Sequence, residues 1–135
     1  MANSRNKGST FEREVAKELF LLTGIEFRRD LDQYRSNDLG DLICDDPSFP
    51  FVIEAKRYAG GGFLAAWWTQ SSRAALAASK LPAVVYRFDR QPIRVRVQLR
   101  AAMECVSRGK WSAEDAHVID VNLPCFAYLI REGMA

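Results

Sequence analysis

The segment that decides the fold runs from Asp41 to Lys56 and reads DLICDDPSFPFVIEAK. Two short apolar runs flank a polar, proline-marked turn, a pattern that predicts a β-hairpin. If the turn is symmetric about Pro47–Ser48, the two strands pair Asp41 with Glu54. The period-two alternation of a strand then places Asp41, Glu54 and Lys56 on one face of the sheet and Ala55 on the other.

Two opposed carboxylates in such a hairpin need a cation between them. At about 5 Å they repel by about 3 kcal/mol at an effective dielectric of about 20. Lys56 supplies one positive charge, and a divalent metal would supply two. Asp38 is the rival to Asp41, which is favoured because it lies next to the strand. A simpler alternative is that Glu54 and Lys56 form a surface ion pair and that Asp41 only ends a turn.

A further acid lies on the predicted first helix, from Ser9 to Thr23. At about 100° per residue, Glu12 lies near the middle of the apolar face, whereas Glu14 and Glu18 point away from it. A carboxylate buried there without a partner would be costly. Either it completes the acidic site, or Ser9 and Glu12 form an S-x-x-E capping box at the helix start; the two roles are compatible.

The composition is that of a single intracellular domain. The chain has 135 residues, 48% of them apolar, and a net charge of +2. We expect a flexible basic arm over residues 1–8 and one domain over 9–135. No apolar run is long enough to span a membrane or to serve as a secretory signal, which favours the cytoplasm, or the host cytoplasm if the chain is viral. The three cysteines are odd in number and widely spaced, as expected for reduced core thiols.

The order of predicted elements indicates an α/β fold with a mixed central sheet flanked by helices. After the first helix come a strand at 25–29, an irregular stretch at 31–40 and the hairpin strands. A second helix covers residues 63–79 and is followed, after Pro82, by strands at 84–88 and 93–99. The chain closes with a strand at 118–121 and a short helix at 126–131.

Positive charge is concentrated between Arg87 and Lys110, a segment that contains seven Lys or Arg residues and only two acidic residues. Such segregation suits a nucleic acid partner. Arg94 and Arg96 alternate along a strand, so they either meet phosphates or only protect a sheet edge. On the second helix, Gln70 and Arg73 lie three residues apart and could address one target, or they form a solvated flank.

Several classes of enzyme are excluded. The chain's one histidine, His117, lies among acids away from the cluster, which argues against histidine-dependent metal nucleases. No glycine-rich phosphate loop precedes a Lys-Ser or Lys-Thr helix start, and no Ser-His-acid or Cys-His set is present.

Asp41 followed by Glu54-Ala55-Lys56, with Glu12 on the preceding helix, resembles the PD-(D/E)xK nuclease superfamily. The residues from Gly8 to Glu14 and the Phe27-Arg28-Arg29 sequence are most similar to archaeal-type Holliday-junction resolvases and their phage relatives. The resemblance covers residues 8–88, and the chain departs from the motif at Gly40, where the family name has proline.

The resemblance implies a restriction-endonuclease-like core and a metal-dependent endonuclease that acts on branched or duplex DNA as a homodimer. Asp41, Glu54 and the Ala55 carbonyl would bind Mg²⁺, for which Mn²⁺ substitutes. Lys56 would orient and help to deprotonate the attacking water, Glu12 would complete the site, and Gln70 would support it. We expect six arginines to bind DNA: Arg28, Arg29, Arg35, Arg73, Arg94 and Arg96. The alternatives are a nuclease for another DNA substrate, such as a repair or restriction-like enzyme, and a non-catalytic DNA-binding module.

Overall fold

The structure, a computed structural model, describes residues 4–30, 40–102 and 117–134. Within them, six strands form one sheet in the order β1-β2-β3-β4-β5-β6. The elements are α1 (Ser4–Thr23), β1 (Arg28–Arg29), β2 (Leu42–Ile43), β3 (Phe51–Tyr58), α2 (Ala65–Ala77), β4 (Leu81–Phe88), β5 (Arg94–Gln98), β6 (Val118–Asn122) and α4 (Leu123–Met134). Neighbouring strands are antiparallel except β3 and β4, which are parallel because α2 connects them. The predicted mixed sheet flanked by helices is confirmed.

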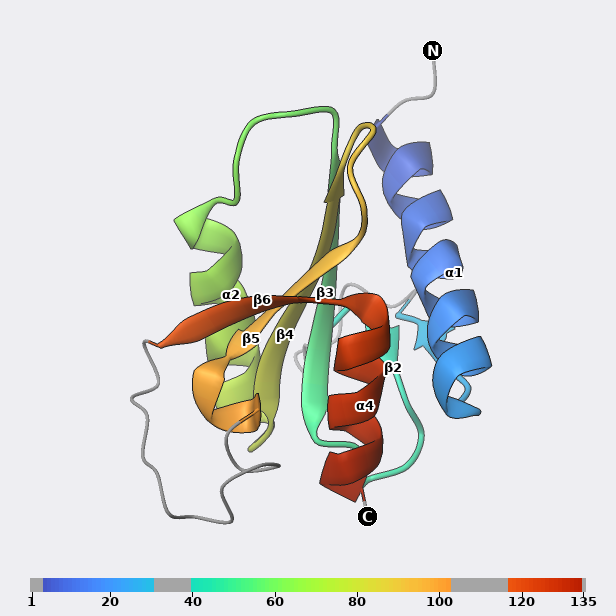
Figure 1. Cartoon of the computed structure of the whole chain (residues 1–135), viewed down its shortest axis with the longest axis vertical. Coiled ribbons are helices and arrows are strands. Elements are labelled where there is room, and N and C mark those ends of the chain that lie inside the picture. Colours follow the sequence, from blue (N-terminus) through green and yellow to red (C-terminus); the bar gives the residue numbers. More distant parts are fainter. Residues whose placement is uncertain (1–3, 31–39, 103–116, 135) are drawn as a thin grey trace.

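The helices cover the two faces of the sheet unequally (Figure 1). One face is packed by α1 and α4, whose largest buried side chains include Phe11, Leu19 and Phe126. On β3 this face receives Phe51, Ile53 and the partly buried Ala55. Because side chains alternate along a strand, Glu54 and Lys56 face the opposite side, where α2 packs. None of the described helices combines the length and apolar character needed to cross a lipid bilayer.

The α2 face is lined by aromatic rings. Trp67 of α2 is 6% exposed and stacks on Tyr58 of β3, with ring centroids 5.0 Å apart. It also stacks on Phe88 of β4, and Tyr86 meets Phe63 edge to face at 5.1 Å. These contacts show that the even-numbered side chains of β3 and β4 share this face.

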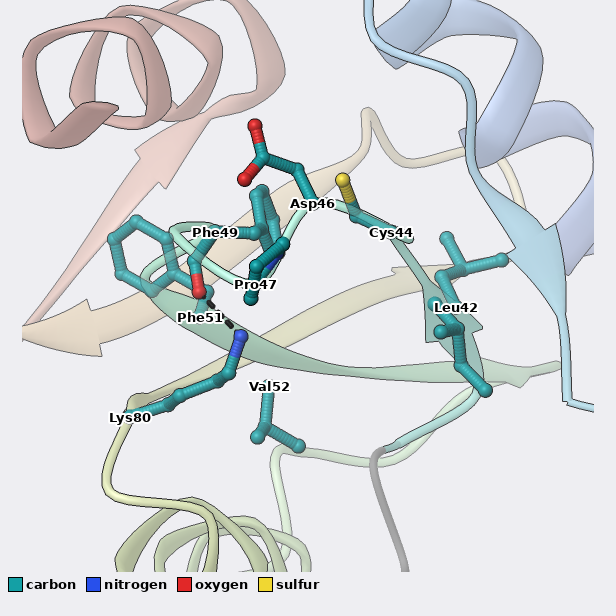
Figure 2. Close-up of a pocket in the computed structure, with 9 residues that line it drawn as sticks. Leu42, Cys44, Asp46, Pro47, Phe49, Phe51, Val52 and Lys80 are labelled. Atoms are coloured by element: carbon teal, nitrogen blue, oxygen red, sulfur yellow. Dashed lines mark hydrogen bonds between the residues drawn. The ribbon is translucent and has the colours of Figure 1, made fainter. Parts of the chain in front are cut away.

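The turn between β2 and β3 is held by polar contacts at both ends. Asp46 Oδ1 accepts hydrogen bonds from the Ser48 backbone N–H at 2.9 Å and from its hydroxyl at 2.8 Å. These two bonds lower the pKa of Asp46. Figure 2 shows Lys80 reaching from the α2–β4 connection to donate to the Phe49 carbonyl. A cavity of about 250 Å³, lined by residues that include Leu42, Cys44 and Val52, lies beside this turn.

Two predicted boundaries are wrong at the start of α1. The helix begins at Ser4 and not at Ser9, so residues 4–8 are helical where a flexible arm is predicted. A tertiary ion pair explains the extension, because Lys7 Nζ lies 3.0 Å from a carboxylate oxygen of Asp89 at the end of β4. Ser9 therefore lies inside the helix and cannot cap its start, so the predicted capping box with Glu12 is wrong.

Strand β4 begins before Pro82, at Leu81, and not after it as predicted. The Leu81 N–H donates to Pro50 on the β3 side, so Pro82 presents its nitrogen to the β5 side. The register with β5 starts only at Ala83, which pairs with Val97. The missing N–H of proline therefore lies beyond the last pair of that ladder, where it costs no hydrogen bond.

Candidate active site

The hairpin has the predicted register. Leu42 pairs with Ile53, which is the pairing that a turn symmetric about Pro47–Ser48 produces. Extending the ladder by one residue brings Asp41 to Glu54. The regular ladder ends there, because the Asp41 N–H donates to the Ile53 carbonyl at 2.8 Å. Asp41 thus lies at the point where β2 stops and β3 continues, paired with β4 on its other side.

Gly40 makes this geometry possible, and sequence reasoning gave it no weight. Its φ is +89°, a left-handed value that L side chains rarely adopt, and a Cβ at this position would lie 2.4 Å from the Ile53 carbonyl oxygen. Proline, which the family motif name has here, is fixed near φ −65° and could not follow this path. The only sequence signal was a glycine directly before the candidate acid.

The Asp41 carboxylate is fixed against the backbone of β3. Its Oδ2 accepts the Ala55 N–H at 2.8 Å. In a strand, the N–H and C=O of one residue project to the same side, so the Ala55 carbonyl also points into the space beyond the end of β2. Asp41 Oδ1 and the Ala55 carbonyl oxygen are therefore two oxygen donors at one sheet edge.

Glu54 and Lys56 project from the α2 face beside this edge. Glu54 is 4% exposed, and Lys56 is half-buried. Over the described ranges, the Lys56 ammonium takes part in no hydrogen bond or ion pair. A carboxylate this deeply buried requires compensation by hydrogen bonds or positive charge.

Glu12 approaches from the opposite side of the sheet. Its Oε2 accepts the Nε–H of Arg29 in β1 at 2.7 Å, and both side chains are mostly buried. Burial raises the pKa of Glu12 despite the Arg29 hydrogen bond, which lowers it, and the nearby negative charge of Asp41 raises it further. Glu12 is thus close enough to Asp41 to feel its charge, but its direct partner is an arginine.

Gln70 and Arg73 are both exposed on α2. Among the residues described, no hydrogen bond joins Gln70 to Asp41, Glu54 or Lys56. The supporting role of Gln70 and the DNA contact of Arg73 stay predictions.

The arginines expected to bind DNA differ in whether they already form ion pairs or hydrogen bonds within the chain. Arg28 pairs with Asp45 at 3.1 Å, and Arg29 pairs with Glu12. Arg96 makes two bonds to Asp120, at 2.9 and 3.0 Å, and its guanidinium lies 3.7 Å from the centre of the Phe63 ring. Arg94 is exposed and has no hydrogen bond or ion pair to any described residue. Arg35 lies outside the described residues.

The donor set suits a hard divalent cation only in part. Mg²⁺ and Mn²⁺ take oxygen ligands, and Mg²⁺ keeps several waters when one or two carboxylates bind it. Asp41, Glu54 and the Ala55 carbonyl can supply such a set. No group of three or more acidic, cysteine or histidine side chains is gathered for a metal in the described part of the chain. A role for Glu12 through a bound water or a second metal stays a prediction.

The mixed sheet and the Asp41, Glu54 and Lys56 spacing define a restriction-endonuclease-like fold of the PD-(D/E)xK type. The sequence pattern of the family described as "Phage putative PDDEXK endonuclease" matches residues 3–127. The chain therefore belongs to this family. PD-(D/E)xK nucleases generally use divalent metals. No curated protein and no solved structure matches the chain.

Proposed function

We propose that this protein is a Mg²⁺-dependent endonuclease that cuts branched DNA and resolves four-way junctions as a homodimer. The observation that carries the proposal is the hairpin register with the bond from the Ala55 N–H to Asp41, which brings Asp41 at the end of β2 beside the β3 segment that carries Glu54 and Lys56. The choice of a junction rests on the resemblance of residues 8–14 and 27–29 to junction resolvases. Two symmetric cuts need two active sites, and one chain offers one.

In this mechanism each side chain has a distinct task. Asp41 and Glu54 would hold the divalent metal, which when bound would neutralise charge on the phosphate and lower the pKa of water. The Ala55 N–H keeps the Asp41 carboxylate turned toward the site. Lys56 donates a hydrogen bond that orients the attacking water. Glu12, hydrogen-bonded to Arg29 and near the charge of Asp41, would complete the site through a bound water.

The test is cleavage of labelled DNA by the wild type and by Glu54→Gln, with Glu18→Gln as control. Glu18 is an exposed acid of α1, so its change removes a negative charge away from the site. We expect Glu54→Gln to lose at least about a thousandfold in cleavage rate, or about 4 kcal/mol of transition-state stabilisation, while it still binds DNA. Glu18→Gln should match the wild type.

The substrates separate the three possible functions. Four-way junctions, linear duplex and single strands are incubated with Mg²⁺, and each reaction is repeated with a chelator. Paired cuts in the junction alone support a resolvase, whereas equal cutting of junction and duplex supports a nuclease for another substrate. Binding without cutting, unchanged by Glu54→Gln but lost in Arg94→Ala, supports a non-catalytic module.

A further inference from the structure

A second cavity is lined by residues of β4 and β5 and of the loops at the end of the sheet. It has a volume of about 380 Å³ and lies between the loop that follows β3 and the turn that joins β4 to β5. Both segments lie at the same end of the sheet (Figure 1). Its lining includes Gly60, Gly61, Tyr86, Phe88 and Arg94. This volume lies in the range of cavities that accept small organic ligands.

The strand register connects this cavity to Lys56. Lys56 pairs with Tyr86 across β3 and β4, and Tyr86 pairs with Arg94 across β4 and β5. Paired residues project from the same face of a sheet, and adjacent strands lie about 4.8 Å apart. The three side chains therefore form one row of about 10 Å, from the proposed catalytic lysine to the far wall of the cavity.

The cavity combines three features that suit a nucleotide. The partly exposed ring of Phe88 supplies an aromatic surface against which a base can stack, whereas Tyr86 is 7% exposed and packs against Phe63. The loop at Gly60 and Gly61 has no side chains, and a Cβ at either residue would meet no atom within 4 Å, so a ligand can approach the backbone there. Arg94 offers an exposed guanidinium that makes no ion pair with any described residue and is suited to a phosphate.

The acid in the cavity lining does not oppose an anionic ligand. Asp89 forms ion pairs with both Lys7 and Arg57. The hydrogen bonds from Lys7 and Arg57 lower the pKa of the Asp89 carboxyl, so its charge is offset by two cations. Lys7, Arg57 and Asp89 together carry a net positive charge, which favours a phosphate beside Arg94.

We propose that this cavity receives one unpaired nucleotide of the DNA strand that is cut, next to the scissile phosphate. The base stacks against Phe88, and its phosphate binds Arg94. A base that is paired and stacked within a duplex cannot enter such a pocket, so the nucleotide must be unpaired or turned out of the helix. The inference rests on the proposed nuclease function and adds a structural reason for selecting branched DNA.

The experiment uses the Glu54→Gln protein, which should bind DNA without cutting it, and junctions that carry the fluorescent base 2-aminopurine. The probe is placed at successive positions around the cut site. We expect stacking to quench the fluorescence at one position only. A second set of junctions lacks the base at each position in turn. Binding of these junctions to the Glu54→Gln protein, with no substitution in the cavity, should weaken by about 5- to 150-fold when the base is missing at that same position.

Two phenylalanine substitutions provide the matched pair. Gly60→Phe, added to Glu54→Gln, should fill the cavity and abolish the position-specific quenching. Gly62→Phe changes the same loop outside the cavity lining and should leave the quenching intact. Neither glycine has a positive φ, so neither change forces backbone strain.

The outcomes separate this inference from the proposed function. If the wild type cuts junctions but no position is quenched and every base can be removed without loss of affinity, the cavity holds no nucleotide and the nuclease stands. If the protein neither binds nor cuts DNA, both proposals are wrong. Because the base-removal series needs no loop variant, misfolding of Gly60→Phe cannot hide a negative result.

Discussion

Replacing Gly40 with alanine should destabilise the protein and disable the site at once. The left-handed φ of +89° costs an alanine about 1–2 kcal/mol. The added Cβ would lie 2.4 Å from the Ile53 carbonyl oxygen, a backbone atom of a central strand that cannot yield. The chain at Gly40 must shift instead. That shift breaks the bond from the Asp41 N–H to Ile53 and weakens the bond from the Ala55 N–H to Asp41, at about 1 kcal/mol each.

The sum is a loss of about 3–4 kcal/mol in the free energy of unfolding, measured by urea denaturation. Two glycines of the same chain are controls. Gly24 has a φ of +75° but no atom within 4 Å of its Cβ position, so Gly24→Ala should cost only the backbone term of about 1–2 kcal/mol. Gly62 has neither feature, and Gly62→Ala should be nearly neutral.

The same three variants test whether the path of the chain through Gly40 serves the chemistry. Displacing a catalytic group by about 1 Å can cost about a hundredfold in rate. Gly40→Ala should therefore lose about a hundredfold or more in cleavage rate at a temperature where it remains folded, whereas Gly24→Ala should keep the wild-type rate. If Gly40→Ala is no less stable and no less active than Gly24→Ala, the argument from the Ile53 contact is refuted.

Three further changes have defined outcomes. Lys56→Met should lower the cleavage rate by about 10²- to 10⁴-fold without loss of DNA binding in a gel-shift assay, whereas Lys80→Met should reduce stability but keep cleavage. Because the fold raises the pKa of Glu12 above 4.5, its stabilising contribution is complete below pH 4.5 and is lost as the pH rises through the folded pKa. In urea denaturation measured from pH 4 to pH 7, the wild type should lose stability through this group as the pH rises, and Glu12→Gln should not. An identical pH dependence of the free energy of unfolding in both proteins would contradict the raised pKa of Glu12. Arg96→Lys should cost about 1–2 kcal/mol in thermal unfolding, because lysine cannot keep both the bidentate bond and the Phe63 stack.

The hairpin could be predicted from local sequence because its turn is symmetric and both its strands are apolar. The Leu42–Ile53 register follows from these features alone. Alternation also placed Ala55 on the face opposite Glu54 and Lys56.

The features that could not be predicted from local sequence depend on contacts between residues far apart in the chain. The start of α1 is set by Lys7 meeting Asp89, and the partner of Glu12 is Arg29 on another element. A capping box was the nearest local explanation for Glu12, and it was wrong. The role of Gly40 depends on how closely the chain returns to Ile53, which no pattern of residue types specifies.

The most direct test of the central claim is a crystal grown with Mn²⁺ and measured for anomalous scattering of that ion. We expect a peak that lies about 2.0–2.3 Å from carboxylate oxygens of Asp41 and Glu54 and from the Ala55 carbonyl oxygen. The peak should vanish in Glu54→Gln crystals and persist in Glu18→Gln crystals. Ordered Mn²⁺ elsewhere in the protein, with none at this sheet edge, would contradict the account.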